Sequence, residues 1–135
     1  MTVREQRVHF SRLLATLVLW VYEQKDARGE WELAFDEVTV HSPRPAWVDG
    51  KRVAVTDAVH KHGSSHHAGL AADLNLYIGG KWIADGGDPA WSLIGTRWES
   101  MHGLCTWGGR FPAGDMNHFS FGEGSALDPG AVTVA

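Results

Sequence analysis

The chain has 135 residues, of which 44% are hydrophobic and 21% are charged, as in a soluble globular protein with one core. Its formal net charge of −4 excludes the basic field that nucleic-acid binding requires, so we expect no nucleic-acid partner. Cys105 is the only cysteine, which excludes an intrachain disulfide and a cysteine-based zinc knuckle. We expect Cys105 to be a small buried residue and any metal site to consist of His, Asp and Glu side chains.

The N-terminal segment is apolar over residues 13–22 and has arginines before that run, which is also the pattern of a secretory signal. However, the run is too short to span a bilayer, and no small-residue cleavage site follows it. The apolar residues recur instead on one face of a helix, at Phe10, Leu13, Leu14, Leu17 and Val21. The pattern predicts a buried helix over residues 2–25 that ends before Gly29, with no signal peptide and no stable membrane association.

The next part of the chain predicts one strand and a long polar connection. Residues 31–40 are rich in β-branched and aromatic side chains, which is typical of a strand, and two prolines then favour a loop over 42–51. Residues 52–59 are compatible with a helix or with an irregular segment. Residues 60–67 are polar and contain glycine, which indicates a loop.

A hairpin and a second helix are predicted next. Residues 71–78 alternate between apolar and polar, and Gly79-Gly80 is typical of a two-residue turn into a return strand over 81–84. Apolar residues then recur at helical spacing over 88–101, where Asp88 and Pro89 suit the first positions of a helix.

Two short strands are predicted after this helix, over residues 104–110 and 117–122. With no internal repeat and no linker, the chain is expected to form one α+β domain over residues 1–124, in which an antiparallel sheet packs against helices. Residues 125–135 are small and turn-rich, which predicts a flexible tail. We expect a monomer.

Two segments concentrate potential metal ligands. His66 lies in the predicted loop and Asp73 on the strand that follows, while His118 lies on the last strand. A catalytic zinc takes three protein ligands from His and carboxylate side chains and keeps one position for water. These three residues would supply such a set. Strand alternation would place Asp73 and His118 on the polar faces of their strands, at an open sheet face.

Asp115 lies three residues before His118, close enough to reach a water on the same metal. Zinc can lower the pKa of a bound water to about 7, so a nearby carboxylate can take its proton and later protonate a leaving amine. Spacing alone leaves an alternative open, in which these residues are surface histidines of a polar loop and ordinary strand residues.

The same residues resemble the two motifs of the M15 family of zinc peptidases. The first motif of that family is S-x-H-x-x-G-x-A-x-D, and this chain reads Ser64-x-His66-x-x-Gly69-x-Ala71-x-Asp73. The second is similar to Trp107-Gly108-Gly109 followed by Asp115-x-x-His118-Phe119, in the same order and spacing. The family includes D-Ala-D-Ala carboxypeptidases and dipeptidases, and the L-alanyl-D-glutamate peptidases that bacteriophages use as endolysins.

The resemblance implies the fold of M15 and Hedgehog-like D-Ala-D-Ala peptidases, with Zn²⁺ held by His66, Asp73 and His118 and with Asp115 as general base and acid. The adjacent His67 is the alternative ligand to His66. The implied substrate is the stem peptide of bacterial peptidoglycan, to which Ser64 would hydrogen-bond. We also consider Trp107 a candidate for the wall of the substrate cleft.

A lone catalytic domain of this kind is most similar to the phage endolysins. The resemblance therefore implies a protein that stays in the host bacterial cytoplasm until a holin lesion releases it to the periplasm and cell wall. The expected reaction is hydrolysis of the L-Ala–D-Glu bond. The alternatives are the same chemistry on D-Ala–D-Ala, and an inactive zinc-stabilised domain that binds the cell wall.

One departure from the family concerns the cation that polarises the scissile carbonyl. Family members commonly carry an arginine at the end of the first strand or just after it. Here Arg44 lies a few residues later than that position, and His41 lies closer to the strand. Either Arg44 or His41 is therefore the candidate for this role.

Overall fold

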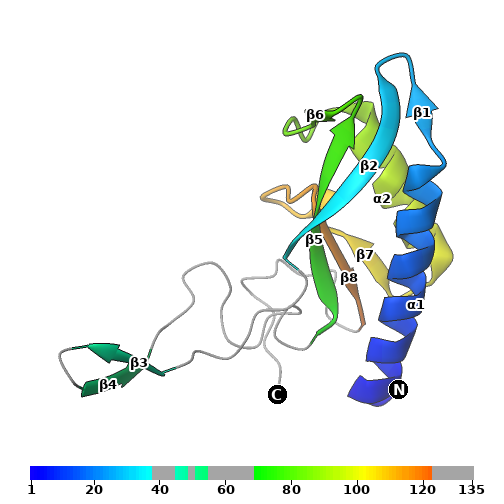
Figure 1. Ribbon diagram of the computed structural model, residues 1–135. Coiled ribbons are helices and arrows are strands. Elements are labelled where there is room, and N and C mark those ends of the chain that lie inside the picture. The colour runs from blue at the N-terminus through cyan, green and yellow to red at the C-terminus, as the bar shows by residue number, and fades with distance from the viewer. Residues whose placement is uncertain (38–44, 49–50, 55–68, 123–135) are drawn as a thin grey trace.

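The computed structural model describes residues 1–37, 45–48, 51–54 and 69–122. Within these ranges two helices and a curled antiparallel sheet form a small α+β fold, as the sequence predicted. The order of elements is α1 (Val3–Tyr22), β1 (Lys25–Asp26), β2 (Gly29–Glu37), β3 (Pro45–Val48), β4 (Lys51–Ala54), β5 (Ala71–Ile78), β6 (Lys81–Trp82), α2 (Pro89–Met101), β7 (Cys105–Trp107), η1 (Gly108–Arg110) and β8 (His118–Phe121). Figure 1 shows this arrangement.

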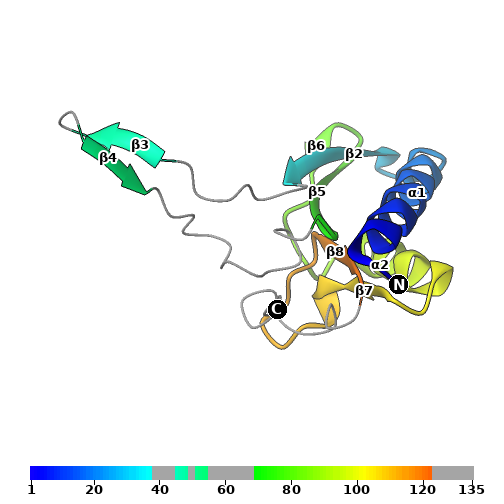
Figure 2. The same ribbon diagram turned by 90° about the horizontal axis from the view of Figure 1, so that it is seen from below.

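The main sheet has the order β1–β2–β5–β8–β7, and β6 also pairs with β5. Both helices cover the same face of this sheet (Figure 2). One edge of β5 pairs with β2 along its length, and the other edge is shared, with β8 beside residues 71–73 and β6 beside residues 77–78. β5 is therefore the central strand on which the rest of the sheet is assembled.

Helix α1 buries Phe10, Leu14, Leu17 and Val21 against the sheet, which confirms the predicted apolar face. It begins at a Thr2 cap, whose side chain accepts a hydrogen bond from the Glu5 amide. Among the described residues, no helix combines the length and the apolar character that crossing a bilayer requires.

The predicted C-terminal end of this helix is wrong. The helix stops at Tyr22, and residues 25–26 instead pair with residues 29–30 in the hairpin formed by β1 and β2. The Asp26 carboxylate accepts hydrogen bonds from the Arg28 amide and guanidinium and from the Trp31 indole. These bonds stabilise a turn where local spacing predicted more helix.

The segment around residue 50 also differs from the prediction. A loop over 42–51 and a helical or irregular segment over 52–59 were expected, but β3 and β4 pair as a separate two-stranded sheet. Asp49-Gly50, between the two strands, is a typical hairpin-turn dipeptide whose significance the proline-based loop prediction overlooked. The expected loop over 60–67, the end of the first predicted strand and the C-terminal tail lie outside the described residues.

The hairpin formed by β5 and β6 follows the prediction, although β6 is shorter than expected. Gly79 and Gly80 have φ values of 58° and 80°, a backbone conformation that glycine adopts without steric cost. Helix α2 also begins as predicted, with Asp88 as its cap and Pro89 at its first position.

The strand predicted over residues 104–110 is correct only in its first half. β7 ends at Trp107, and residues 108–110 form the short helix η1. The Trp98 indole on α2 donates to the carbonyls of Thr106 and Ser120 and so joins the helix to β7 and β8. Cys105 is a buried core residue, as predicted, and burial raises the pKa of its thiol to about 12.

Candidate metal centre

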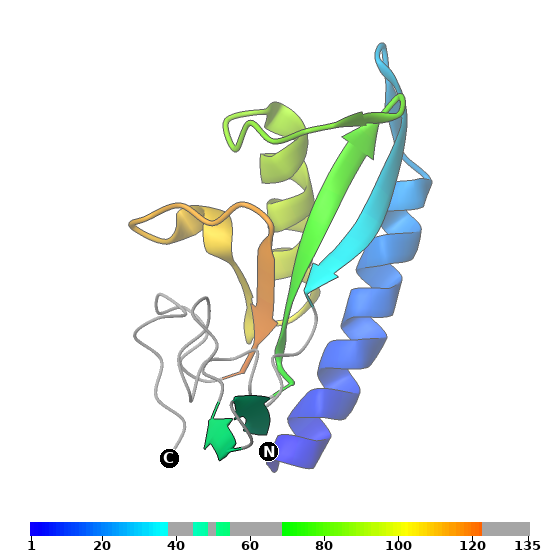
Figure 3. The same cartoon turned by 60° about the vertical axis from the view of Figure 1, so that its left-hand side comes forward.

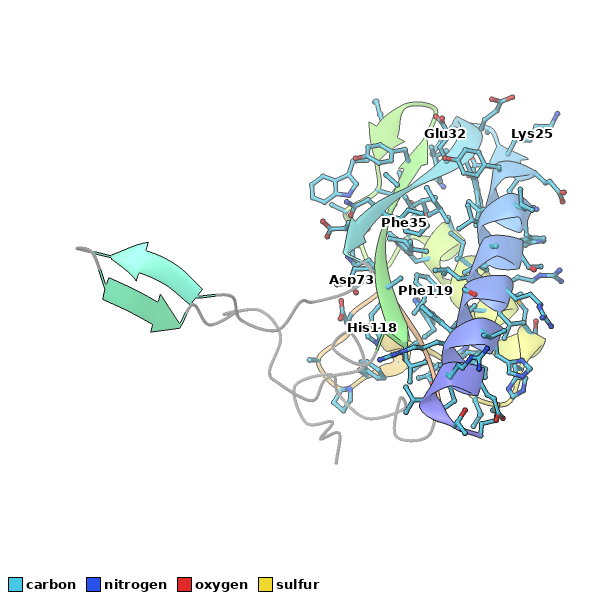
Figure 4. The ribbon with its side chains drawn as sticks, turned by 60° about the horizontal axis from the view of Figure 1, so that its bottom comes forward. Lys25, Glu32, Phe35, Asp73, His118 and Phe119 are labelled. Carbon is cyan, nitrogen blue, oxygen red and sulfur yellow. The ribbon has the colours of Figure 1, made fainter. Side chains whose placement is uncertain are left out.

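Asp73 and His118 lie opposite each other on neighbouring strands. They are Cα partners in the antiparallel pairing of β5 with β8, and His118 Nδ1 lies 3.4 Å from Asp73 Oδ1. Their chain neighbours Leu74 and Phe119 are fully buried in the core. Figure 4 shows Asp73 and His118 on the side of the sheet that faces away from α1, with Phe119 on the side of the helix. The predicted alternation is therefore confirmed for both strands.

Asp115 approaches Asp73 and His118 from the loop between η1 and β8. Its carbonyl accepts a hydrogen bond from the His118 amide, and its amide donates to the Gly108 carbonyl. Asp73, Asp115 and His118 each offer one ligand atom, and these three atoms lie within 4.8 Å of one another. Two predicted zinc ligands and the predicted general base thus meet in one cluster.

Gly108 allows the backbone of this loop to approach His118 closely. A Cβ atom at position 108 would lie 2.4 Å from the Asp115 carbonyl oxygen and 2.7 Å from the His118 Cβ. Real Cβ atoms do not tolerate such contacts, so only glycine fits here. Position 108 therefore requires glycine for steric reasons, which its place in the motif did not reveal.

Trp107, the candidate for the cleft wall, lies in the core. Only 6% of the residue is exposed, and its ring packs against the site of Gly95 on α2, where a Cβ would lie 2.0 Å away. Its indole N–H donates to the Met116 carbonyl at 2.7 Å. Trp107 thus supports the loop that carries Asp115.

The cluster of Asp73, Asp115 and His118 is more enclosed than the open sheet face that the sequence predicted. All four residues of β8 are buried, and His118 is only 1% exposed. The loop after β7 lies on the side of the sheet away from α1 (Figure 3), and from this loop the Phe111 ring lies 5.4 Å from the His118 ring. Asp73, with a 13% exposed side chain, and the half-buried Asp115 are more accessible.

The chemistry of these donors fits a transition-metal ion. Zinc binds His nitrogen and carboxylate oxygen at about 2.0–2.2 Å, so tetrahedral ligand atoms lie roughly 3.5 Å apart. A cluster within 4.8 Å needs only small side-chain adjustments to reach that spacing. An imidazole among the donors favours zinc or a similar metal over magnesium or calcium, which prefer oxygen alone. The cluster can therefore hold a metal ion, and zinc is compatible with it.

The other predicted site residues lie outside the described part of the chain. These are the third zinc ligand His66, its alternative His67, the substrate-binding Ser64 and the two carbonyl-polarising candidates His41 and Arg44. Their assignments remain predictions from the sequence.

In comparisons with known proteins, no family model matches this chain and no curated protein matches it.

Proposed function

We propose that this chain is a zinc-dependent peptidase that hydrolyses the L-Ala–D-Glu bond of the peptidoglycan stem peptide, as in M15 phage endolysins. The observation that carries the proposal is the convergence of Asp73, Asp115 and His118 on one point of the sheet. The sequence motifs had selected these three residues from a chain with 16 acidic residues and 8 histidines. Their proximity supports the proposal because Asp73 lies about forty residues from the other two in the sequence and still joins them in space.

Each residue of the candidate site has a separate role in the proposed reaction. A zinc ion bound here would polarise the scissile carbonyl and make water acidic enough to be deprotonated near neutral pH. Asp73 and His118 fit as ligands, with His66 as the third. We assign Asp115 as the base because it lies on the loop before β8, whereas Asp73 lies on the central strand β5. Asp115 would take the proton of the attacking water and then deliver it to the departing amine of D-Glu.

The role of Asp115 is tested by Asp115→Ala. We expect lysis of purified cell walls to fall at least about 100-fold, because general acid–base catalysis contributes that much or more. Zinc should stay bound, as measured by metal analysis of the dialysed protein. Asp85→Ala is the matched control, because the Asp85 carboxylate accepts from the Gly87 amide in a different loop. Lysis by Asp115→Ala at the wild-type rate would refute the assignment.

The third ligand is tested by a pair of neighbouring variants. His66→Ala should release zinc and abolish lysis, whereas His67→Ala should retain both. The opposite pattern would make His67 the ligand. Loss of zinc in neither variant would mean that the described cluster holds the metal without this loop.

Product analysis identifies the scissile bond. Cleavage of L-Ala–D-Glu leaves new amino termini on D-Glu, which mass spectrometry of digested peptidoglycan detects. Release of free D-Ala would assign the D-Ala–D-Ala reaction to the same site. Sedimentation with peptidoglycan and no product would indicate a binding domain.

A further inference from the structure

Trp82 is unusual among the tryptophans whose side chains the structure describes. It is 61% exposed, whereas Trp31, Trp91, Trp98 and Trp107 are each at most 6% exposed. Isolated exposed apolar residues are ordinary, so exposure alone carries no function. The position of Trp82 relative to its neighbours on the sheet is more informative.

Trp82 continues a line of side chains that starts at the metal centre. It is the cross-strand partner of Tyr77, and alternation along β5 places Tyr77 and Asn75 on the same face as Asp73. Asn75 and Tyr77 are partly exposed, whereas Leu74, Leu76 and Ile78 on the other face are buried. We call Asn75, Tyr77 and Trp82 the sheet-face track. At about 3.3 Å per residue, Tyr77 lies roughly 13 Å along the strand from Asp73.

The chemistry of this track suits a neutral sugar. Exposed aromatic rings pack against the C–H faces of pyranose rings, and a side-chain amide such as that of Asn75 can hydrogen-bond to hydroxyl and acetamido groups. Glu32, which is exposed, lies opposite Tyr77, and Asp73 lies at the other end. These two carboxylates disfavour an anionic polymer on the same face.

We propose that the sheet-face track binds the glycan strand of peptidoglycan beside the stem peptide that enters the metal centre. The inference rests on the proposed function, because that function supplies a substrate in which sugar and scissile bond are joined. L-Ala and the lactyl ether that links it to the amino sugar together span roughly 7 Å when extended, about two residues of chain. A peptide bond at Asp73 therefore places the attached sugar beside Asn75, roughly 7 Å along the strand, and the next sugar of the glycan strand can reach the aromatic part of the track.

A binding experiment tests the track without requiring catalysis. Glycan strands stripped of their peptides are titrated into the full chain, with affinity measured by calorimetry and the Trp82 indole N–H followed by NMR. We expect Trp82→Ala to weaken binding about five- to tenfold, since one aromatic contact is worth that order of affinity. Leu93→Ala is the matched control, because Leu93 is 56% exposed on α2, which covers the opposite face of the sheet. Unchanged binding by Trp82→Ala, or equal loss in both variants, would overturn the inference.

A kinetic comparison then links the track to cleavage. The ratio of kcat/KM on a sugar-bearing muropeptide to kcat/KM on the free stem peptide should fall in Trp82→Ala and stay unchanged in Leu93→Ala. An unchanged ratio in Trp82→Ala would contradict the inference while the peptidase function stands. Glycan binding through Trp82 with no cleavage by the wild type would refute the proposed function and leave the glycan site intact.

Discussion

Asp73 and His118 face each other across β5 and β8, with His118 Nδ1 3.4 Å from Asp73 Oδ1, although the two residues lie far apart in the sequence. Their meeting depends on the register of the sheet, because a slip by one residue would turn one side chain to the opposite face. The Leu74 amide donates to the Asn117 carbonyl beside this pair, and Leu74 and Phe119 are fully buried. Core packing thus fixes the positions of Asp73 and His118 in the candidate metal site.

Gly108→Ala should distort the cluster of Asp73, Asp115 and His118 through a steric clash alone. The added methyl group would clash with the Asp115 carbonyl and with His118, so we expect a loss of about 1–3 kcal/mol in the free energy of unfolding, together with weaker zinc binding. Urea unfolding and zinc titration measure the two effects. Gly103→Ala is the control, because a Cβ there meets nothing within 4 Å, and its effect should stay within about 0.5 kcal/mol. Equal behaviour of the two variants would contradict the close approach of the loop.

Trp107→Phe should slow hydrolysis while zinc remains bound. The variant keeps a ring against Gly95 but removes the N–H that donates to the Met116 carbonyl next to Asp115. Loss of this part-buried hydrogen bond costs about 1 kcal/mol, and relaxation of the loop would displace the proposed base. Trp31→Phe loses a comparable indole hydrogen bond, to Asp26, far from the site. It should lower stability without changing turnover; a similar turnover loss in both variants would reject a specific role for Trp107.

Arg28 should determine part of the acid stability of the fold. Its guanidinium bonds to Asp26 at the β1–β2 turn and to Asp88 at the start of α2. Hydrogen bonds from the Arg28 side chain lower the pKa of the Asp26 carboxyl from 3.8 to about 2 and also lower the pKa of Asp88. The stabilisation is therefore present above pH 4 and is lost as pH falls toward 2.

Arg28→Ala should accordingly melt at a lower temperature than the wild type at pH 6, and the two melting curves should converge near pH 2. Salt should reduce the difference, because the Arg28 and Asp26 side chains are 46% and 30% exposed. Thermal melts across this pH range give the comparison. Parallel curves down to pH 2 would show that Arg28 stabilises the fold by something other than these ion pairs.

Local rules predicted the parts of the fold that depend on neighbouring residues in the chain. The apolar face of α1, the alternation of β5, the Gly79-Gly80 turn and the Asp88 cap are all local patterns, and all are confirmed. The end of α1 was mispredicted because a turn held by Asp26 competes with helix there. The pairing of β3 with β4 was missed because the loop prediction rested on two prolines and took no account of Asp49-Gly50.

The residues of the candidate site were likewise predicted where sequence spacing decides and missed where packing between distant elements decides. Motif spacing predicted that Asp73, Asp115 and His118 would share a site, and the described cluster agrees. Spacing did not predict that Trp107 would be buried against Gly95, because that contact joins β7 to α2 through the core. Nor did it predict that the Phe111 ring would lie against the His118 ring. Such contacts depend on how distant elements pack and leave little trace in a single sequence.

A paired measurement shows whether Asp73 and His118 hold a catalytic metal with Asp115 as the base. Zinc content of the purified wild-type chain is determined together with mass spectrometry of the peptidoglycan it has digested, with Asp73→Ala as the comparison. We expect one zinc per wild-type chain and new D-Glu amino termini, with both lost in Asp73→Ala. Intact peptidoglycan after incubation with zinc-loaded wild type, or zinc fully retained by Asp73→Ala, would contradict this assignment.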